Sequence, residues 1–278
     1  MSTHTPTRPD RPRTPPTGQR TSQLRVIASE WTKFRSLRST IWTLLIAAVL
    51  TIGAGVLFSA AVPGQYKSVS EAERYGFDAT DTSLYGILFC QLALGILGVM
   101  LMSAEYSSGM IRSTLAVIPA RLPVLWAKLA VFAGVTFLLT LIAGLVAFLA
   151  GQAMMSSDNL GVSLSAPGAV GKIVGAALYV TLAGLIGVAL GSLLRNTAAG
   201  ISTYVAVFVM VPLVAQALPA SIGDHFLQYL PSNAGGAMFG GADGVTNALS
   251  PLTGFLVLTA FTAVLVGGAA WRLKARDA

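Results

Sequence analysis

The sequence predicts an all-α integral membrane protein, in which six transmembrane helices follow an amphipathic elbow helix in the membrane interface. Of the 278 residues, 54% are hydrophobic and only 10% are charged, and the mean hydropathy is +0.71. A soluble domain carries about 25% charged residues. The apolar residues also gather in six long runs. Residues 22–278 are therefore expected to form a single transmembrane domain.

The first 21 residues are rich in proline, threonine and arginine, and their one apolar side chain is Met1. Such a segment cannot bury a core, so residues 1–21 are expected to be a disordered basic tail. A cleaved signal peptide is not predicted. The polar stretch ahead of the first apolar run is too long for one, and that run exceeds the roughly 7–15 residues of a signal sequence.

Residues 22–38 have the apolar period of a helix. Apolar side chains recur on one stripe at three- and four-residue spacing, and these are Leu24, Ile27, Trp31 and Phe34. The basic side chains lie mostly on other faces, at Arg25, Lys33, Arg35 and Arg38. A basic amphipathic helix with Trp and Phe on its apolar side is typical of the membrane interface. The alternative is a helix packed on a soluble domain, but the sequence offers no soluble domain for it to pack on.

Six apolar segments follow, each long enough for a helix to cross a hydrocarbon core of about 30 Å. They are expected at residues 41–62, 84–104, 124–150, 170–194, 198–218 and 251–271. Pro212 is expected to kink the fifth span. Small residues four apart in the fourth span, at Gly171–Gly175 and Gly187–Gly191, favour close packing between helices within one subunit over a contact between subunits.

The charges of the loops predict the orientation. If the amino terminus is cytoplasmic, the opposite side holds three basic residues, Lys67, Arg74 and Lys172, and the other 15 of the 18 lie on the cytoplasmic side. Cytoplasmic loops carry an excess of Lys and Arg. We therefore expect a multi-pass protein of the cell membrane with both termini in the cytoplasm. Glu105, Lys128 and Lys172 lie at the rims of spans, where their side chains are expected to snorkel to water.

The outer loop at residues 219–250 is half apolar and contains short stretches with helical character, at 221–230 and 234–239. Apolar backbone beside a membrane is stable where it is buried in protein, so one interpretation is a re-entrant segment. An ordinary surface loop with a few buried anchors is equally compatible with these residues.

Several kinds of chemistry are not supported by the sequence, because the motifs or residues that they require are missing. No G-x-x-x-x-G-K-[ST] motif occurs, so the chain has no P-loop for ATP. Neither histidine lies in a predicted span, and Asp224 and His225 have no third ligand nearby for a metal. The basic residues flank apolar runs without interleaved aromatic residues, which argues against nucleic acid. Without carboxylates or histidines deep in the spans, the chain lacks a proton relay, so transport would need an external energy source.

The cytoplasmic loop at residues 105–123 separates the second and third spans. Glu105 ends one apolar run, and Pro119 and Pro123 close a short helix-like stretch at 110–118. By residue type alone, this segment could simply turn the chain around at the membrane surface. Its sequence, with the strings SEWTKFRSLRST and YLPSNAGGAMF and the layout of the whole chain, resembles the permease subunits of bacterial type-2 ATP-binding-cassette (ABC) transporters. Family members often have Thr where this chain has Met110.

The resemblance implies the membrane subunit of an ABC exporter that is not itself an enzyme. Two permease subunits, identical or paralogous, would form the pathway, and a separate ATPase would bind ATP and Mg²⁺, so this chain would hold no cofactor or metal. The residues implied to couple to the ATPase are Glu105, Gly109, Ile111, Arg112, Leu115 and Ile118. Those implied for the elbow are Trp31, Phe34 and Arg35. The competing hypothesis is a membrane scaffold or sensor that recruits another cytoplasmic partner.

Overall fold

A computed structural model describes residues 23–66, 77–107, 109, 121–217, 226–242, 245 and 247–275. Within these ranges the chain is helical and contains no strand. Among the described residues, six helices are long and apolar enough to cross a membrane. Their bounds are Arg38–Tyr66, Ala79–Ser107, Leu122–Met155, Ala169–Leu194, Thr197–Ala215 and Pro251–Ala275. This architecture confirms the predicted fold class of six membrane-spanning helices. The predicted coupling stretch at 110–118 lies outside the described residues.

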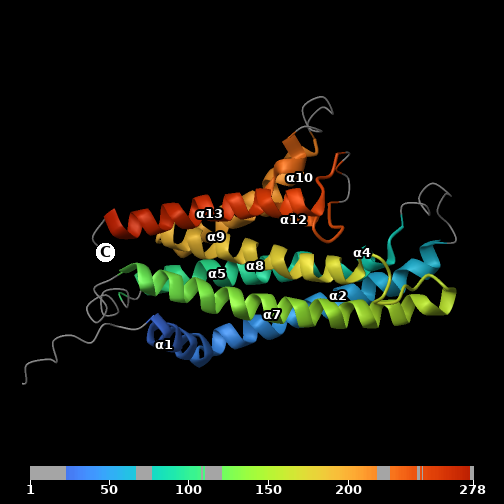
Figure 1. Cartoon of the computed structure of the whole chain (residues 1–278), viewed down its shortest axis with the longest axis horizontal. Helices are drawn as coiled ribbons and strands as arrows, with labels where there is room; N and C mark the ends of the chain where they lie inside the picture. The colour runs from blue at the N-terminus through green and yellow to red at the C-terminus, as the bar shows by residue number, and fades with distance from the viewer. Residues whose placement is uncertain are drawn as a thin grey trace, which may run out of the picture.

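The first two helices are separated by a single residue. Helix α1 (Gln23–Ser36) ends at Leu37, and α2 (Arg38–Tyr66) begins directly after it. Helix α2 is longer than the expected span of 41–62 by about a turn at each end. Figure 1 shows α1 beside the first turns of α7 (Arg121–Met155). We refer to this end of the bundle, which also holds the end of α13 (Pro251–Ala275), as the α1 end.

Helices α5 (Ile87–Ser107) and α8 (Ala169–Leu194) form the centre of the bundle. Figure 1 shows α9 and α13 on one side of them and α2 and α7 on the other. Most side chains of α8 are buried, in contrast to those of the outer helices. A helix that is apolar all round must be covered on every face by protein or by lipid. Here α8 is covered by protein, and the outer helices leave apolar faces exposed.

Glycines allow α5 and α8 to touch along their backbones. A β-carbon added at Gly187 would overlap the carbonyl oxygen of Gly95, and one at Gly191 would lie 2.5 Å from the carbonyl oxygen of Val99. The fourth-span glycines therefore serve packing inside the subunit, as the small-residue spacing predicted. Gly171 is the exception, because a β-carbon there would meet no atom within 4 Å.

Gly187→Ala is expected to destabilise the protein by about 1–3 kcal/mol, because the added methyl group must push α5 from α8. Gly171→Ala is the matched control on the same helix, and it should be neutral or slightly stabilising, since alanine favours a helix. Cys90 is the single cysteine and is buried, so its reaction with a thiol dye during heating reports unfolding. Equal melting temperatures for the two variants would contradict the close contact.

Two of the spans contain a break. In the second, α4 (Ala79–Leu84) is separated from α5 by Tyr85 and Gly86, where a β-carbon on Gly86 would overlap the backbone of Thr51. In the fifth, α9 (Thr197–Val205) continues as a π-helix (Ala206–Met210) and then as α10 (Val211–Ala215). In Figure 1, α10 leaves the direction of α9. The break comes just before Pro212, which has no N–H to donate.

The apolar segment before the last span folds into the bundle. Of the stretch expected at 221–230, the structure describes residues 226–230, which include a 3₁₀ turn (Leu227–Tyr229). Helix α12 (Pro231–Gly236) follows, and it begins three residues before the stretch expected at 234–239. The ring of Phe239 stacks on that of Tyr179 in α8 with centroids 5.4 Å apart. The Tyr179 hydroxyl donates to Gln91 of α5, so one tyrosine joins three segments. This segment therefore forms part of the protein core at the end opposite α1.

Candidate functional site

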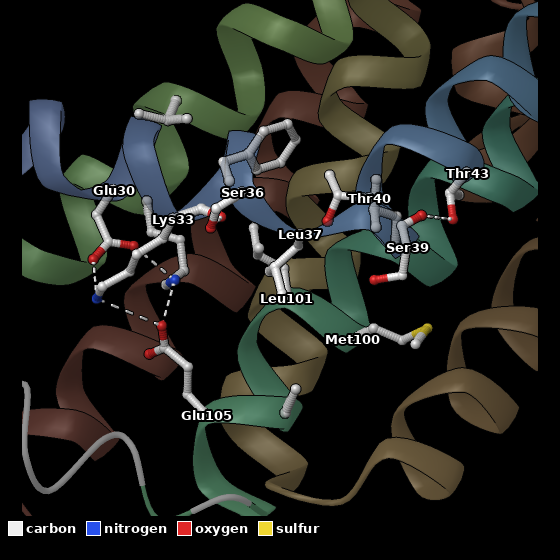
Figure 2. Close-up of a pocket in the computed structure, with 15 residues that line it drawn as sticks. Glu30, Lys33, Ser36, Leu37, Ser39, Thr40, Thr43, Met100, Leu101 and Glu105 are labelled. Carbon is white, nitrogen blue, oxygen red and sulfur yellow. Dashed lines mark hydrogen bonds and ion pairs between the residues drawn. The ribbon is translucent and has the colours of Figure 1, made fainter.

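Four charged side chains from three helices meet at the α1 end of the bundle. The ammonium of Lys128 in α7 donates to Glu30 Oε2 in α1 and to Glu105 Oε1 in α5, at 2.8 Å each. Lys33 Nζ donates to Glu30 Oε1 at 2.7 Å and lies 3.9 Å from Glu105 Oε1. We call this group the charged cluster, and Glu30, Lys33 and Glu105 are labelled in Figure 2. It connects the helix before the first span to the helices on both sides of residues 108–120.

The charged cluster is largely shielded from solvent. Glu30, Glu105 and Lys128 are 4%, 6% and 3% exposed, whereas the side chain of Lys33 is 32% exposed. Burial favours the protonated form of Glu30, but the charge of Lys128 and hydrogen bonds from both lysines outweigh it. The pKa of the Glu30 carboxyl therefore lies below its ordinary value. Two carboxylates and two ammonium groups cancel in charge, which makes their joint burial tolerable.

Helix α1 places Glu30 by packing one face against α7. Val26, Glu30 and Phe34 follow one another at four-residue spacing and are all buried, as expected for neighbours on a helix. Val26 packs with Val124 and Ala127 of α7. Farther along α1, the ring of Phe34 meets that of Phe132 edge to face, with centroids 6.4 Å apart. Glu30 is therefore held between two apolar contacts at the height of Lys128.

The predicted apolar stripe of the elbow agrees only in part with the structure. Leu24 and Trp31 are exposed, at 75% and 46%, and Arg35 is exposed as well. Phe34 is buried at 4% and faces the protein, so its expected place on the membrane side is wrong. The physical reason is that α1 has two apolar faces, one of which packs on α7. That Trp31 and Arg35 lie in the membrane interface stays a prediction.

The expected snorkelling of Glu105 and Lys128 is also wrong. Both side chains are buried and paired, because Glu30 brings a second carboxylate to the same ammonium. Sequence reasoning missed Glu30 as a site residue. It is the only acidic residue between positions 22 and 38, and it lies one helical turn from Val26 and from Phe34. An acid on an apolar helix face is the signal that could have identified it.

The remaining predicted coupling residues lie beyond the last turn of α5. Gly109 has a left-handed φ of 70°, and its N–H donates to the carbonyl oxygen of Tyr106 at 3.3 Å. Glycine adopts such a conformation without strain and commonly follows a helix end. Ile111, Arg112, Leu115 and Ile118 lie outside the described residues. Their role in coupling stays a prediction.

Further polar contacts join helix ends at the α1 end. The guanidinium of Arg195, just after α8, lies 4.9 Å above the ring of Tyr106 of α5. Arg272 of α13 donates to the carbonyl oxygen of Leu193, the acceptor type that basic residues favour at a helix C-terminus. Ser103 and Thr197 share a hydrogen bond of 2.8 Å between α5 and α9. The helices that flank the charged cluster are thereby tied to the rest of the bundle.

A second set of ion pairs lies at the end opposite α1. Lys172 Nζ of α8 is 2.6 Å from Asp78 and 2.5 Å from Asp81, so its expected snorkelling is replaced by pairing. Asp78 also caps α4 by accepting from the N–H groups of Thr80 and Asp81. Burial works against the charge of Asp78, but the hydrogen bonds from Lys172 and the backbone hold the pKa of its carboxyl below the ordinary value.

The polar groups of the described residues are better suited to linking helices than to catalysing a chemical reaction. Among these residues no three His, Cys, Asp or Glu side chains gather as a metal site would need. The thiol of Cys90 is buried within hydrogen-bond distance of Thr140, in surroundings typical of an inert cysteine. What the charged cluster does provide is a mechanical link between α1, α5 and α7.

Comparison with known proteins identifies the family. A search of curated proteins finds no match. The family model described as ABC-2 family transporter protein matches residues 26–213, about two thirds of the chain. The matched region runs from α1 to the fifth span and contains all four residues of the charged cluster. With the six membrane-spanning helices, this match shows that the chain belongs to the ABC-2 family and is a multi-pass membrane permease subunit of an ABC transporter.

Proposed function

We propose that this permease subunit belongs to an exporter and that residues 105–123 couple it to a separate ATPase. The observation that carries the proposal is the buried bridge from Glu30 through Lys128 to Glu105. It fastens together α1 and the two helices that lead into and out of residues 108–120. A displacement of that segment would therefore move three helix ends together.

These contacts support the following mechanism. Binding of ATP by the partner pushes on the segment after α5, and the Glu105–Lys128 pair keeps the ends of α5 and α7 from separating. The Lys128–Glu30 pair makes α1 follow. The backbone contact between α5 and α8 at Gly187 carries the tilt of α5 into the centre of the bundle. Packed cores shift between discrete arrangements, so a small push becomes a rigid-body rotation.

The assembly consists of two permease subunits and two ATPase subunits, which is the usual organisation that membership of this family implies. ATP and Mg²⁺ bind to the partner, because this sequence has no P-loop. The second permease is another copy or a paralogue. The excess of basic residues on one side supports a place in the cell membrane with both termini in the cytoplasm. The α1 end is then the cytoplasmic end, where the ATPase binds.

Copurification tests this function directly. The permease, tagged at its carboxyl terminus, is isolated in mild detergent from the native membrane, and its partners are identified by mass spectrometry. The expected partner has a P-loop and shows vanadate-sensitive ATP hydrolysis in the complex. A scaffold or sensor predicts a partner without a P-loop and no hydrolysis above background. That second outcome would overturn the coupling proposal.

A further inference from the structure

A pocket of about 380 Å³ lies between the α1–α2 bend and α5. Figure 2 shows Glu30, Lys33 and Glu105 at one end of it, and Thr43 and Met100 at the other. Between them the wall is mostly apolar, with Phe34, Leu37, Leu97 and Leu101, and it also contains the hydroxyl groups of Ser36, Ser39 and Thr40. Ligand pockets commonly measure roughly 300–1,000 Å³ and combine an apolar wall with a few polar groups. The pocket is thus charged at one end and mostly apolar along its length.

The charged end has hydrogen-bond donors to spare. An ammonium carries three N–H groups, and the acceptor of Lys33 among the described residues is Glu30 Oε1. The side chain of Lys33 is about one third exposed. Acceptors are less available, because both oxygens of Glu30 hold an ammonium. Glu105 Oε2 has no partner in the described part of the chain, but it is itself buried.

The charge around the pocket favours an anion as well. The two carboxylates and two ammonium groups of the charged cluster cancel. Exposed Arg35 and Arg38 beside the α1–α2 bend therefore leave this surface positive. Basic residues on an amphipathic helix at a membrane attract anionic lipids. We propose that this pocket binds a phospholipid-type amphiphile, with its phosphate at Lys33 and one acyl chain along Leu37, Leu101 and Met100. The site does not depend on whether the protein exports anything.

Binding is measured by native mass spectrometry of the purified protein with lysophosphatidylglycerol. Monoacylglycerol with the same chain lacks the phosphate, and glycerol 3-phosphate lacks the chain. The expected result is one tightly bound lysophosphatidylglycerol and at least about tenfold weaker binding of either fragment, since each loses one half of the recognition. Equal binding of monoacylglycerol would overturn the role of Lys33. Equal binding of glycerol 3-phosphate would overturn the role of the apolar wall.

Two pairs of variants locate the ligand. Leu101→Trp fills the pocket and should weaken binding about tenfold or more, whereas Leu138→Trp, the same change at an exposed position of α7, should not. Lys33→Met should also weaken binding about tenfold, as expected for one charge-assisted hydrogen bond. Arg25→Met removes the same charge from an exposed position of α1 that does not line the pocket, and it should change binding less than twofold. If Lys33→Met does not fold, the Leu101 and Leu138 pair decides alone. If the two variants of either pair weaken binding equally, the lipid adsorbs to the protein surface in general. That result would overturn the proposed site.

Discussion

Replacing Lys128 with methionine is expected to lower the stability of the folded protein by about 3–5 kcal/mol, the usual cost of leaving buried charges without a partner. The change leaves Glu105 without an ammonium in hydrogen-bond distance and leaves Glu30 with Lys33 alone, although both carboxylates are less than a tenth exposed. Lys33 cannot replace the lost ammonium, since it lies 3.9 Å from Glu105 and is partly solvated. In the Cys90 thiol assay, the melting temperature should fall by on the order of 10 °C.

Two controls separate loss of the bridge from loss of charge. Arg35→Met removes one exposed positive charge from the same end and should shift the melting temperature by no more than about 2 °C, as for an ordinary surface change. Adding Glu30→Gln and Glu105→Gln to Lys128→Met should recover much of the lost stability, because neutral amides leave no buried charge uncompensated. A Lys128→Met protein that melts like Arg35→Met would contradict the role of the bridge.

Much of the membrane architecture could be predicted because its cause is local. A run of about twenty apolar residues is sufficient for a helix to span the membrane, so six spans followed from the sequence. Breaks inside spans are harder to predict because they depend on neighbours. Pro212 marked one region, but the π-helix before it carries no sequence signal of its own. The bend at Gly86 depends on Thr51 from another helix.

The charged cluster shows why the site was only half predictable. The resemblance of the sequence to a family implies that Glu105 is a coupling residue, and the sequence places Lys128 as a basic residue at the rim of a span. Their connection depends on Glu30, which is 98 residues from Lys128 in the chain. The predicted apolar stripe of α1 includes Leu24 and Trp31, which are exposed, and it leaves out Glu30, which lies one turn from Phe34 on the buried face. The face of α1 that is buried is decided by α7, so the pattern of α1 alone could not reveal it.

Introducing an acidic side chain at residue 111 or at residue 112 is expected to detach the ATPase while leaving the permease folded. Ile111→Asp places a charge on the predicted apolar stripe of the coupling helix, and Arg112→Glu inverts its predicted polar contact. A small interface depends on a few buried contacts, so each variant should lose about 1–3 kcal/mol of binding, roughly ten- to a hundredfold in affinity. Both should lie outside the membrane core, so the melting temperature reported by Cys90 should stay near that of the unmodified protein.

The decisive measurement is made in one detergent sample, in which the amount of ATPase retained by the tagged permease and its hydrolysis rate are read together. Arg38→Glu is the matched control, because it makes the same charge reversal at an exposed residue of the α1 end. If general surface charge attracts the ATPase, Arg38→Glu and Arg112→Glu weaken retention equally. If the segment binds as a coupling helix, only Arg112→Glu and Ile111→Asp do so. Full retention and full hydrolysis in both of those variants would refute the coupling role, while the bridge of Glu30, Lys128 and Glu105 would still stand as a structural link.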